Sequence, residues 1–429
     1  MKTILNPAKS AWKTILERPT KTVDDIEKTV LQIFDDVQKN GDLAVDKYTS
    51  LFDGVQIKEK LVTATEIEEA IQAISIELKE AIRVAHRNIL LFHKSQKTEK
   101  VAVETYRGVF CWQEKRPIQK VGLYIPGGTA PLFSTVLMLA IPAQIVGCKE
   151  IVLCSPPNKE GKIHPAILYA ANLCGVTKII KVGGIQAIAG LTFGTKIIPK
   201  VYKIFGPGNQ YVTKAKELIQ REGIAIDMPA GPSEVLVIAD ESCSPTFVAA
   251  DLLSQAEHGA DSQVILLSNS IEVINQTDVE LQKQLNKLPR KKIAGQALEN
   301  SRAIQLTSIA ECIEFSNLYA PEHLIIASEI AESYVDKIIN AGSVFLGNYS
   351  CESAGDYASG TNHTLPTNGY VRNYSGVSID SFVRKITFQS LTKEGIAEIG
   401  PAIELMADAE ELFAHKNAVT LRLKTLQND

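Results

Sequence analysis

One short stretch, 254–259, combines two residue types that could bind a metal ion. Gln255 offers a neutral oxygen and His258 offers an imidazole three positions later, just before a glycine. Ser244 and Pro245 predict the start of a helix that ends at that glycine, because serine caps helices and proline is favoured in the first turn. Residues three apart share a helix face, and the negative end of the helix dipole attracts cations. A metal site and an ordinary capped helix end both remain open.

A carboxylate and an imidazole, Glu322 and His323, stand side by side where a strand is expected to begin. Such a pair can transfer protons twice, with histidine as the base for a hydroxyl and glutamate as the base for a water. Strand alternation would point the two side chains in opposite directions, so both reach one cavity only if the backbone is irregular there. A structural pair on a strand edge also remains open.

The segment 350–363 is too polar and too rich in small residues to be a core element. We expect a long loop, in which Asp356 offers a hard anionic ligand and His363 a nitrogen donor. Four of the seven histidines lie after residue 250, each beside polar residues or glycine. This distribution favours a functional site in the second half of the chain, although a solvated surface loop would look the same.

Two regions of alternating β-rich and helical patterns predict parallel, doubly wound sheets. The first has expected strands at 121–124, 151–154, 178–182 and 201–205, with helices near 133–146, 164–173, 185–191 and 209–221. The second has expected strands at 235–239, 263–267, 324–326 and 343–346. Residues 1 to about 118 are expected to be helical, with one helix over 74–93. After residue 376 the pattern is strand-poor and ends in a helical tail.

Glycine-rich turns follow three strands of the first region, at 126–128, 183–184 and 206–209. Ligands of parallel sheets bind at the carboxyl ends of the strands, where helix N-termini favour phosphates, so a dinucleotide is plausible. Tyr211 stands where the usual G-x-G-x-x-G fingerprint requires its third glycine. From the motif alone, these turns are equally well explained as ordinary connections.

Composition excludes several classes of protein. The 429 residues are 45% hydrophobic and 22% charged, which is typical of a globular chain of two or three domains. The net charge of -4 and the lack of a basic stripe argue against nucleic acid. Neither a membrane-length apolar run nor a signal-peptide core is seen, so we expect a cytoplasmic protein without membrane contact. Seven cysteines without a Cys-x-x-Cys pair indicate reduced thiols.

Six strings, in the same order over nearly the whole chain, closely resemble the histidinol dehydrogenase family. They are Tyr124-Ile125-Pro126-Gly127-Gly128, Gly231-Pro232-Ser233-Glu234, Ser254 to Gly259, Pro321-Glu322-His323-Leu324, Ser353-Ala354-Gly355-Asp356-Tyr357 and Ala414-His415-Lys416-Asn417-Ala418-Val419. The resemblance implies an oxidoreductase that converts L-histidinol to L-histidine through L-histidinaldehyde, in the last steps of histidine biosynthesis. It also implies NAD as cofactor, one Zn2+ per site and a homodimer in which each tail completes the partner's active site.

Residue roles follow from the same resemblance. The implied zinc ligands, which also bind the substrate, are Gln255, His258, Asp356 and His415. Ser233, His323, His363 and Glu410 would bind the substrate, Glu322 and His323 would be the catalytic acid/base pair, and Tyr124, Gln186 and Asn209 would contact NAD. We expect an arm at 1–20, an α/β domain formed by 21–124 and 233–377, a Rossmann-like nucleotide-binding α/β domain at 125–232 and a tail at 378–429.

Three alternatives stay open. A zinc-dependent hydrolase would need the same ligands and glutamate base but no nucleotide, and a non-catalytic, metal-stapled assembly protein would need no base at all. Within the oxidoreductase interpretation, a cysteine could capture the aldehyde as a thiohemiacetal, with Cys154 and Cys111 as candidates. The water route is favoured because buried thiols are usually inert.

Overall fold

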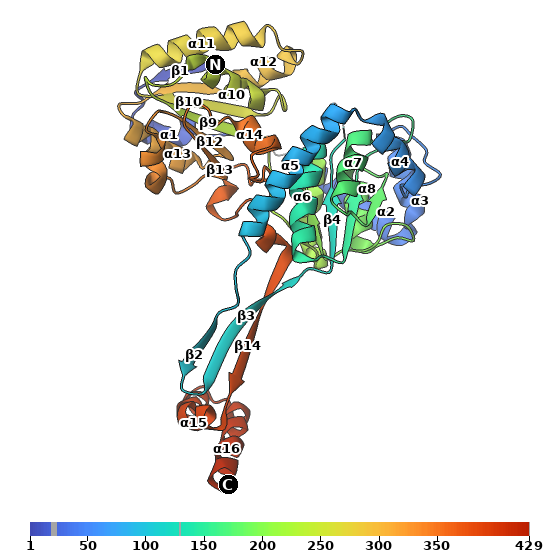
Figure 1. The fold of residues 1–429 in the computed structure, drawn as a ribbon, viewed down its shortest axis with the longest axis vertical. Helices are drawn as coiled ribbons and strands as arrows, with labels where there is room; N and C mark the ends of the chain where they lie inside the picture. Colours follow the sequence, from blue (N-terminus) through green and yellow to red (C-terminus); the bar gives the residue numbers. More distant parts are fainter. Residues whose placement is uncertain (19–23, 128–129, 429) are drawn as a thin grey trace. The chain divides into compact units, whose positions relative to one another are not determined.

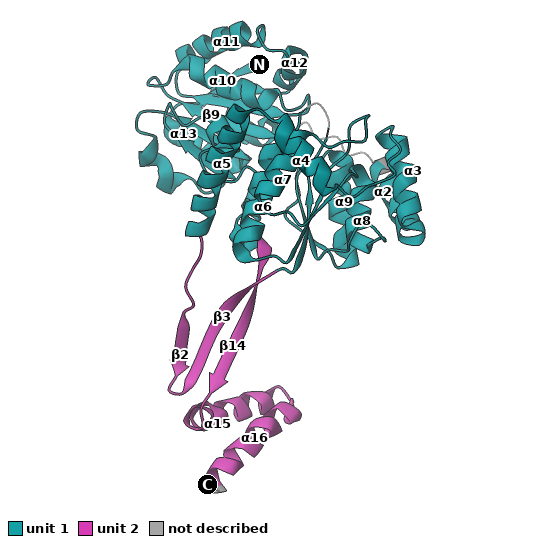
Figure 2. Cartoon of the chain, turned by 45° about the vertical axis from the view of Figure 1, so that its right-hand side comes forward, with its two compact units in different colours: residues 1–95, 118–381 teal, residues 96–117, 382–429 magenta. Residues whose placement is uncertain are grey.

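The computed structural model describes residues 1–18, 24–127 and 130–428 (Figure 1). The chain forms two compact units, coloured separately in Figure 2: unit 1 comprises Met1–Ser95 with Ile118–Ser381, and unit 2 comprises Gln96–Pro117 with Phe382–Asp429. The four-part domain division expected from the sequence stays a prediction. No helix among the described residues is long and apolar enough to cross a membrane.

A six-stranded, wholly parallel sheet forms one core of unit 1. Its strand order is β1 (Lys2–Leu5), β11 (Arg302–Gln305), β10 (Gln263–Ser268), β9 (Glu234–Ala239), β12 (His323–Ala327) and β13 (Ser343–Leu346). One face packs on α10 (Pro245–Ala256), α11 (Ile271–Leu285) and α12 (Lys291–Glu299), and the other on α1 (Trp12–Ile15) and α13 (Ile309–Tyr319). The central strands are apolar at nearly every position because both faces are covered.

A five-stranded parallel sheet forms the other core of unit 1. Its order is β6 (Lys178–Ile180), β5 (Glu150–Cys154), β4 (Lys120–Tyr124), β7 (Lys203–Phe205) and β8 (Ala225–Ile226). Four helices follow its strands: α6 (Phe133–Val146), α7 (Pro165–Leu173), α8 (Gly184–Phe193) and α9 (Gln210–Ile219). The N-terminal helices add an outer layer, in which α2 (Asp24–Asn40) and α3 (Asp42–Phe52) pack on α8, while α4 (Ala64–Ala73) packs on α7 and α5 (Ile76–Ser95) on α6 (Figure 1). The expected two doubly wound parallel sheets are confirmed.

Unit 2 contains a three-stranded antiparallel sheet in the order β14 (Val383–Leu391), β3 (Val109–Pro117), β2 (Ala102–Tyr106), followed by α15 (Lys393–Ala409) and α16 (Phe413–Asn428). The helical tail is confirmed. The expectation that residues 1–118 are helical is wrong at β1, β2 and β3, and the strand-poor reading after 376 misses β14. Most residues of β2 and β14 are exposed, so these strands lack the apolar alternation that marks a half-buried strand.

Smaller differences have local causes. Helix α10 begins after Ser244 as expected but ends at Ala256, so the glycine at 259 lies beyond the helix. The segment 350–363 contains a short helix, α14 (Glu352–Tyr357), where a loop was expected. The remaining elements are 3-10 turns: η1 (Lys9–Ala11), η2 (Gln220–Glu222), η3 (Ala331–Lys337), η4 (Tyr370–Arg372) and η5 (Ile379–Phe382).

Candidate active site

Glu322 and His323 converge on one buried side chain, Gln255. His323 is the first residue of β12, whereas Glu322 precedes the strand and therefore escapes its alternation. Nε2 of Gln255 lies 3.3 Å from Nδ1 of His323 and 3.4 Å from Oε2 of Glu322. All three side chains are buried, with 1%, 3% and 6% of their surface exposed for Gln255, His323 and Glu322. The irregular backbone that the sequence required is thus present.

The backbone of Glu234, at the start of β9, organises these three side chains. Its N–H donates to Oε2 of Glu322 at 2.9 Å, and its carbonyl oxygen accepts from Nε2 of Gln255 at 3.1 Å. The same carbonyl lies 3.3 Å from Nδ1 of His323. A carbonyl only accepts, so we assign the proton of the neutral ring to Nδ1, which leaves Nε2 as the basic nitrogen.

Helix α14 supplies two carboxylates, Glu352 and Asp356, that flank the same imidazole. Oε1 of Glu352 lies 3.5 Å from Nδ1 of His323, and Oδ1 of Asp356 lies 3.7 Å from its Nε2. The two acids are four residues apart, so they share a helix face. His363 joins the group, with Nδ1 2.9 Å from the backbone oxygen of Asp356 and Nε2 3.2 Å from Oγ1 of Thr135.

Burial controls the protonation of this cluster. It lowers the pKa of His323 to about 4, against the opposing effect of Asp356, so the imidazole is neutral at neutral pH. Burial also raises the pKa values of Glu322 and Glu352 well above the ordinary glutamate value. A cation entering the cluster would favour the ionised carboxylates.

Several buried polar atoms in this cluster have no hydrogen-bond partner within the described part of the chain. They include Oε1 of Gln255, Oδ1 of Asp356, Nε2 of His323 and both carboxylate oxygens of Glu352. Unpaired buried acceptors are costly, and a cation would satisfy them. Oxygen donors such as those of Gln255 and Asp356, combined with imidazole nitrogen, are of the kind that binds Zn2+, so the zinc-ligand roles expected for Gln255, His258 and Asp356 stay predictions.

Ligand atoms of His323, Glu352 and Asp356 all lie within 4.8 Å of one another, which makes them a second geometric possibility for a cation. Glu352 was missed by the sequence interpretation, although its four-residue spacing from Asp356 was visible. His258 lies just past the end of α10 and is exposed. Ser233 is half-buried immediately before β9.

The two remaining predicted residues, Glu410 and His415, belong to unit 2. Glu410 is the C-cap of α15, and His415 lies in the first turn of α16. Both are exposed on that unit. Their roles as substrate and metal contacts therefore stay predictions.

The active-site cluster lies at the amino ends of the strands of its sheet. Glu322 and His323 introduce β12, Ser233 and Glu234 introduce β9, and Gln255 lies at the carboxyl end of a helix that leads back to the start of β10. Ligands of parallel sheets usually bind at the opposite, carboxyl edge. The usual rule would therefore have placed the chemistry at the wrong edge of this sheet.

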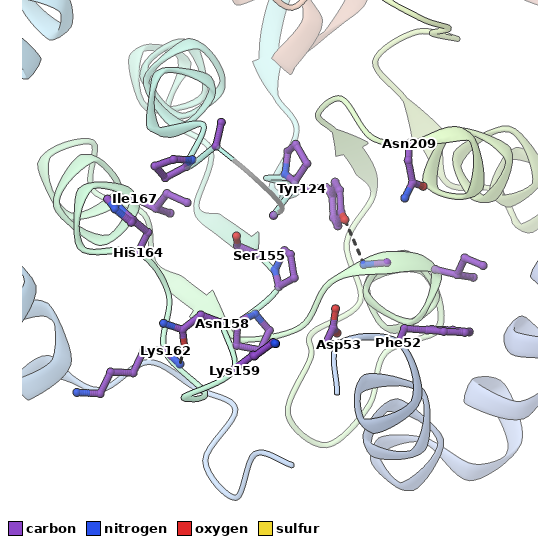
Figure 3. A pocket seen from close by; sticks show the side chains of 18 of the residues that line it. Phe52, Asp53, Tyr124, Ser155, Asn158, Lys159, Lys162, His164, Ile167 and Asn209 are labelled. Carbon is purple, nitrogen blue, oxygen red and sulfur yellow. Dashed lines mark hydrogen bonds between the residues drawn. The ribbon is translucent and has the colours of Figure 1, made fainter. Parts of the chain in front are cut away.

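The five-stranded sheet follows the usual rule. A cavity of about 1000 Å3 opens at the carboxyl ends of its strands (Figure 3). Two of the three predicted NAD contacts, Tyr124 and Asn209, line it. The hydroxyl of Tyr124 accepts a hydrogen bond of 3.1 Å from the backbone N–H of Gly184, drawn as a dashed line in Figure 3. Gln186 is fully buried and does not line the cavity, but its Nε2 lies 3.4 Å from Oδ2 of Asp53, which does.

The N-caps of two helices line this cavity. Helix α9 starts after Asn209, whose Oδ1 accepts from two backbone N–H groups at 3.1 Å, and α7 starts after His164, which also lines the cavity. Lys159 and Lys162 add positive charge to the lining. Phosphates bind readily at such helix starts, and the expected dinucleotide site at this edge of the sheet stays a prediction. Gly128 of the glycine-rich turn lies outside the described residues.

The turn that begins at Gly206 needs glycine for a steric reason. Gly206 has a φ of +121°, and a Cβ atom there would lie 2.0 Å from the backbone oxygen of Tyr124. Only glycine combines this conformation with so close an approach. The turn therefore fixes the cavity wall that carries Asn209.

Neither candidate cysteine gains support as a nucleophile. Cys154 is fully buried at the end of β5, and burial raises the pKa of its thiol far above the ordinary value. Cys111 belongs to β3 in unit 2. A buried, protonated thiol is unreactive, so Cys154 is a poor nucleophile.

Comparisons with known proteins agree with the geometry. Residues 16–423 match the sequence profile of the family described as Histidinol dehydrogenase. The chain is 58% identical over 427 residues to the histidinol dehydrogenase of Bacteroides fragilis, with 100% of both chains covered, and 53% identical over 418 residues to that of Escherichia coli K12, with 97% and 95% covered. The crystal structure of histidinol dehydrogenase from Elizabethkingia anophelis superposes with a TM-score of 0.98 at 62% identity, covering 100% of this chain and 99% of that one.

More distant solved structures share the fold. An acetylating aldehyde dehydrogenase from Geobacillus thermoglucosidasius has a TM-score of 0.51 at 15% identity, over 90% of this chain and 94% of that one. That likeness concerns the arrangement of sheets and helices alone. With a full-length family match, full-length relatives above half identity and a near-superposable solved structure, the chain belongs to the histidinol dehydrogenase family.

Proposed function

We propose that this chain oxidises L-histidinol to L-histidine in two NAD-linked steps, with L-histidinaldehyde between them. The supporting observation is the convergence of a neutral imidazole and a carboxyl group, His323 and Glu322, beside unpaired oxygens of Gln255 and Asp356. Membership of the family adds the substrate and the place in histidine biosynthesis. A zinc-dependent hydrolase is not favoured, because the full-length relatives are named as dehydrogenases.

His323 would act first. Its Nε2 has no hydrogen-bond partner among the described residues, and the carbonyl of Glu234 keeps the ring proton on Nδ1. Nε2 therefore accepts the hydroxyl proton of histidinol, while a hydride leaves the carbon that bears this hydroxyl group and is taken up by NAD. The product of this step is the aldehyde.

Glu322 would act in the second half of the reaction. As a carboxylate it accepts a proton from a water, whose oxygen adds to the aldehyde carbon, while protonated His323 returns its proton to the former carbonyl oxygen, which gives the hydrate and a neutral imidazole. Nε2 of His323 then accepts a hydroxyl proton from the hydrate as the second hydride leaves the same carbon for a second NAD, which yields the carboxylic acid. Glu322 is buried, and the N–H of Glu234 holds its Oε2, so its position relative to His323 is fixed.

Cofactor sites follow from the same residues. Gln255, His258 and Asp356, with His415 from a tail, would hold one zinc ion, which as a Lewis acid would orient the imidazole and amine of the substrate. Tyr124 and Asn209 would contact NAD in the cavity of the five-stranded sheet, and Gln186 would act from beneath it by holding Asp53, which lines the cavity. We further propose a homodimer with shared active sites and a cytoplasmic location.

The test is the stoichiometry of the reaction. Purified protein loaded with zinc, given histidinol and excess NAD, should form two NADH per histidinol consumed, followed by absorbance, with histidine identified as the product. A hydrolase would form no NADH. A ratio of one, with histidinal accumulating, would contradict the assignment of the second half-reaction.

A further inference from the structure

An arginine from the N-terminal segment reaches the residue that supports the candidate catalytic pair. Nε of Arg18 pairs with Oε1 of Glu234, and Nη2 donates to Oε2 at 2.9 Å. Only 3% of the Glu234 side chain and 12% of the Arg18 side chain are exposed. A buried carboxylate is costly unless it is paired, so this two-point contact fixes where Glu234 lies.

Glu234 passes this constraint to the site through its backbone. Its N–H donates to Glu322, and its carbonyl accepts from Gln255 and contacts His323. Its side chain also accepts from the N–H of Asn368 at 3.0 Å. One residue, held at its side chain by Arg18, thus contacts three members of the site with its main chain.

Arg18 also contacts the turn that immediately precedes Glu322. Nη2 donates to the backbone oxygens of Tyr319 at 2.9 Å and Ala320 at 3.3 Å, and the guanidinium lies 4.0 Å from the centre of the Tyr319 ring. Ala320 has a φ of +57°, a left-handed conformation that alanine adopts only when its surroundings impose it. Glu322 follows two residues later, so the same guanidinium contacts both the residue that binds the Glu322 carboxyl group and the turn that precedes Glu322.

We propose that Arg18 is a positioning residue for the acid/base pair, which it places through Glu234 and through the 319–320 turn. The inference rests on the proposed function, because it assumes that Glu322 and His323 transfer protons. A lysine could satisfy the charge of Glu234 but could not bridge two carboxylate oxygens and two backbone carbonyls at once.

Arg18→Met in the full-length, zinc-loaded protein tests this. We expect kcat with histidinol to fall about 10- to 100-fold, because a small misplacement of reacting groups costs this much. KM for NAD should stay within about twofold of the parent, since the nucleotide cavity lies on the other sheet. Arg18→Lys should recover part of kcat. Lys9→Met is the matched control, because Lys9 lies in the same segment and pairs with Glu314 on the surface; it should keep the parental kcat.

A second variant separates positioning from folding. Arg18→Met combined with Glu234→Met removes the buried unpaired carboxylate, so the melting temperature should return toward that of the parent. We expect kcat to stay low, because the 319–320 carbonyls still lack their donor. Recovery of kcat together with the melting temperature would show that Arg18 serves folding alone and would overturn the proposal.

A double-mutant cycle with Glu322→Gln, assayed on histidinal, completes the test. If Arg18 acts through Glu322, Arg18→Met should lower the rate by a smaller factor in the Glu322→Gln background than in the parent. Equal factors would overturn the proposal. If Glu322→Gln oxidises histidinal slowly but Arg18→Met does so at the parental rate, the role of Arg18 is overturned and the proposed function stands. If Glu322→Gln oxidises histidinal at the parental rate, both the role of Arg18 and the proposed role of Glu322 are overturned.

Discussion

The backbone N–H of Glu234 donates a hydrogen bond of 2.9 Å to Oε2 of Glu322, and it does so inside a buried cluster. This contact joins the first residue of β9 to the residue just before β12, which are neighbouring strands of the sheet. Glu322 therefore keeps one oxygen occupied by the main chain and one available for chemistry. Its proposed task, the activation of water, needs such a fixed carboxylate.

Replacing Glu322 should separate the two halves of the reaction. Glu322→Gln should slow the oxidation of histidinal by about 10²- to 10⁴-fold, a range typical of a lost general base. Single-turnover oxidation of histidinol to histidinal should fall much less, because His323 accepts that proton. Rapid-mixing measurements of NADH formation with each substrate check this. If the variant and the parent oxidise histidinal at equal rates, Glu322 does not have the proposed role.

The effects of metal removal on activity and stability should be reversible. A chelator should abolish activity and lower the melting temperature, since a bound ion satisfies Oε1 of Gln255 and Oδ1 of Asp356, and added zinc should restore both. Asp356→Ala should raise the zinc concentration needed for half-maximal stabilisation. Zinc content and melting temperature are read together. An apo-protein that oxidises histidinol at the parental rate would show that zinc has no catalytic part.

Subunit mixing tests the shared active site. His323→Ala impairs the residue at the start of β12 and His415→Ala impairs the tail, so each homodimer should be inactive. If tails complete the partner's site, a mixed dimer gathers both defects in one site and leaves the other intact, and up to about half of the parental activity per mixed dimer returns. Each variant mixed with itself is the control. No recovery after verified subunit exchange would rule out sharing.

Asp53, which lies outside the candidate metal-binding cluster, should make the stability of the protein depend on pH. Burial raises its pKa to about 6, from 3.8. The folded protein thus binds the proton more tightly than the unfolded chain, so this contribution to stability is complete below about pH 4 and is lost as the pH rises through 6. Asp53→Asn should flatten this part of the stability profile. Above pH 7 it should stabilise the protein by about 1 kcal/mol, less than the ~3 kcal/mol of a two-unit shift, because Asp53 is partly exposed.

Melting temperatures between pH 4 and pH 8 check the Asp53 prediction. Asp336→Asn makes the same charge change at an exposed position on η3 and serves as the control. Parallel profiles for Asp53→Asn and the parent would contradict it. A profile that differs only above pH 8 would point to another group.

Local sequence determined much of the fold. Helix α6 occupies the expected 133–146, and the strands that begin the first α/β region lie within one or two residues of their expected bounds. Turn glycines such as Gly206 marked the edge of the five-stranded sheet where its cavity lies, because a left-handed or closely approached backbone position leaves a trace in residue type. Periodicity, caps and turns depend on near neighbours in the chain, which is why sequence alone reveals them.

The tertiary structure decided what the sequence left open. Whether Glu322 and His323 reach the same buried side chain, Gln255, depended on where strand pairing begins, and that is set by β9, some 88 residues away from Glu322. Glu352 became a member of the site only when α14 packed its face toward β12. The exposed strand β14 left no apolar pattern at all.

Residue types, their order and their local spacing therefore determined the two parallel sheets, the family and a set of candidate residues. Contacts between segments far apart in the chain decided which candidate residues meet. They also decided which carbonyl group sets the tautomer of His323 and which arginine pairs with the buried Glu234. Arg18 and Glu234 lie 216 positions apart, yet they form a two-point ion pair. Such pairs form only when packing removes water from both groups, and no local pattern in the sequence records that event.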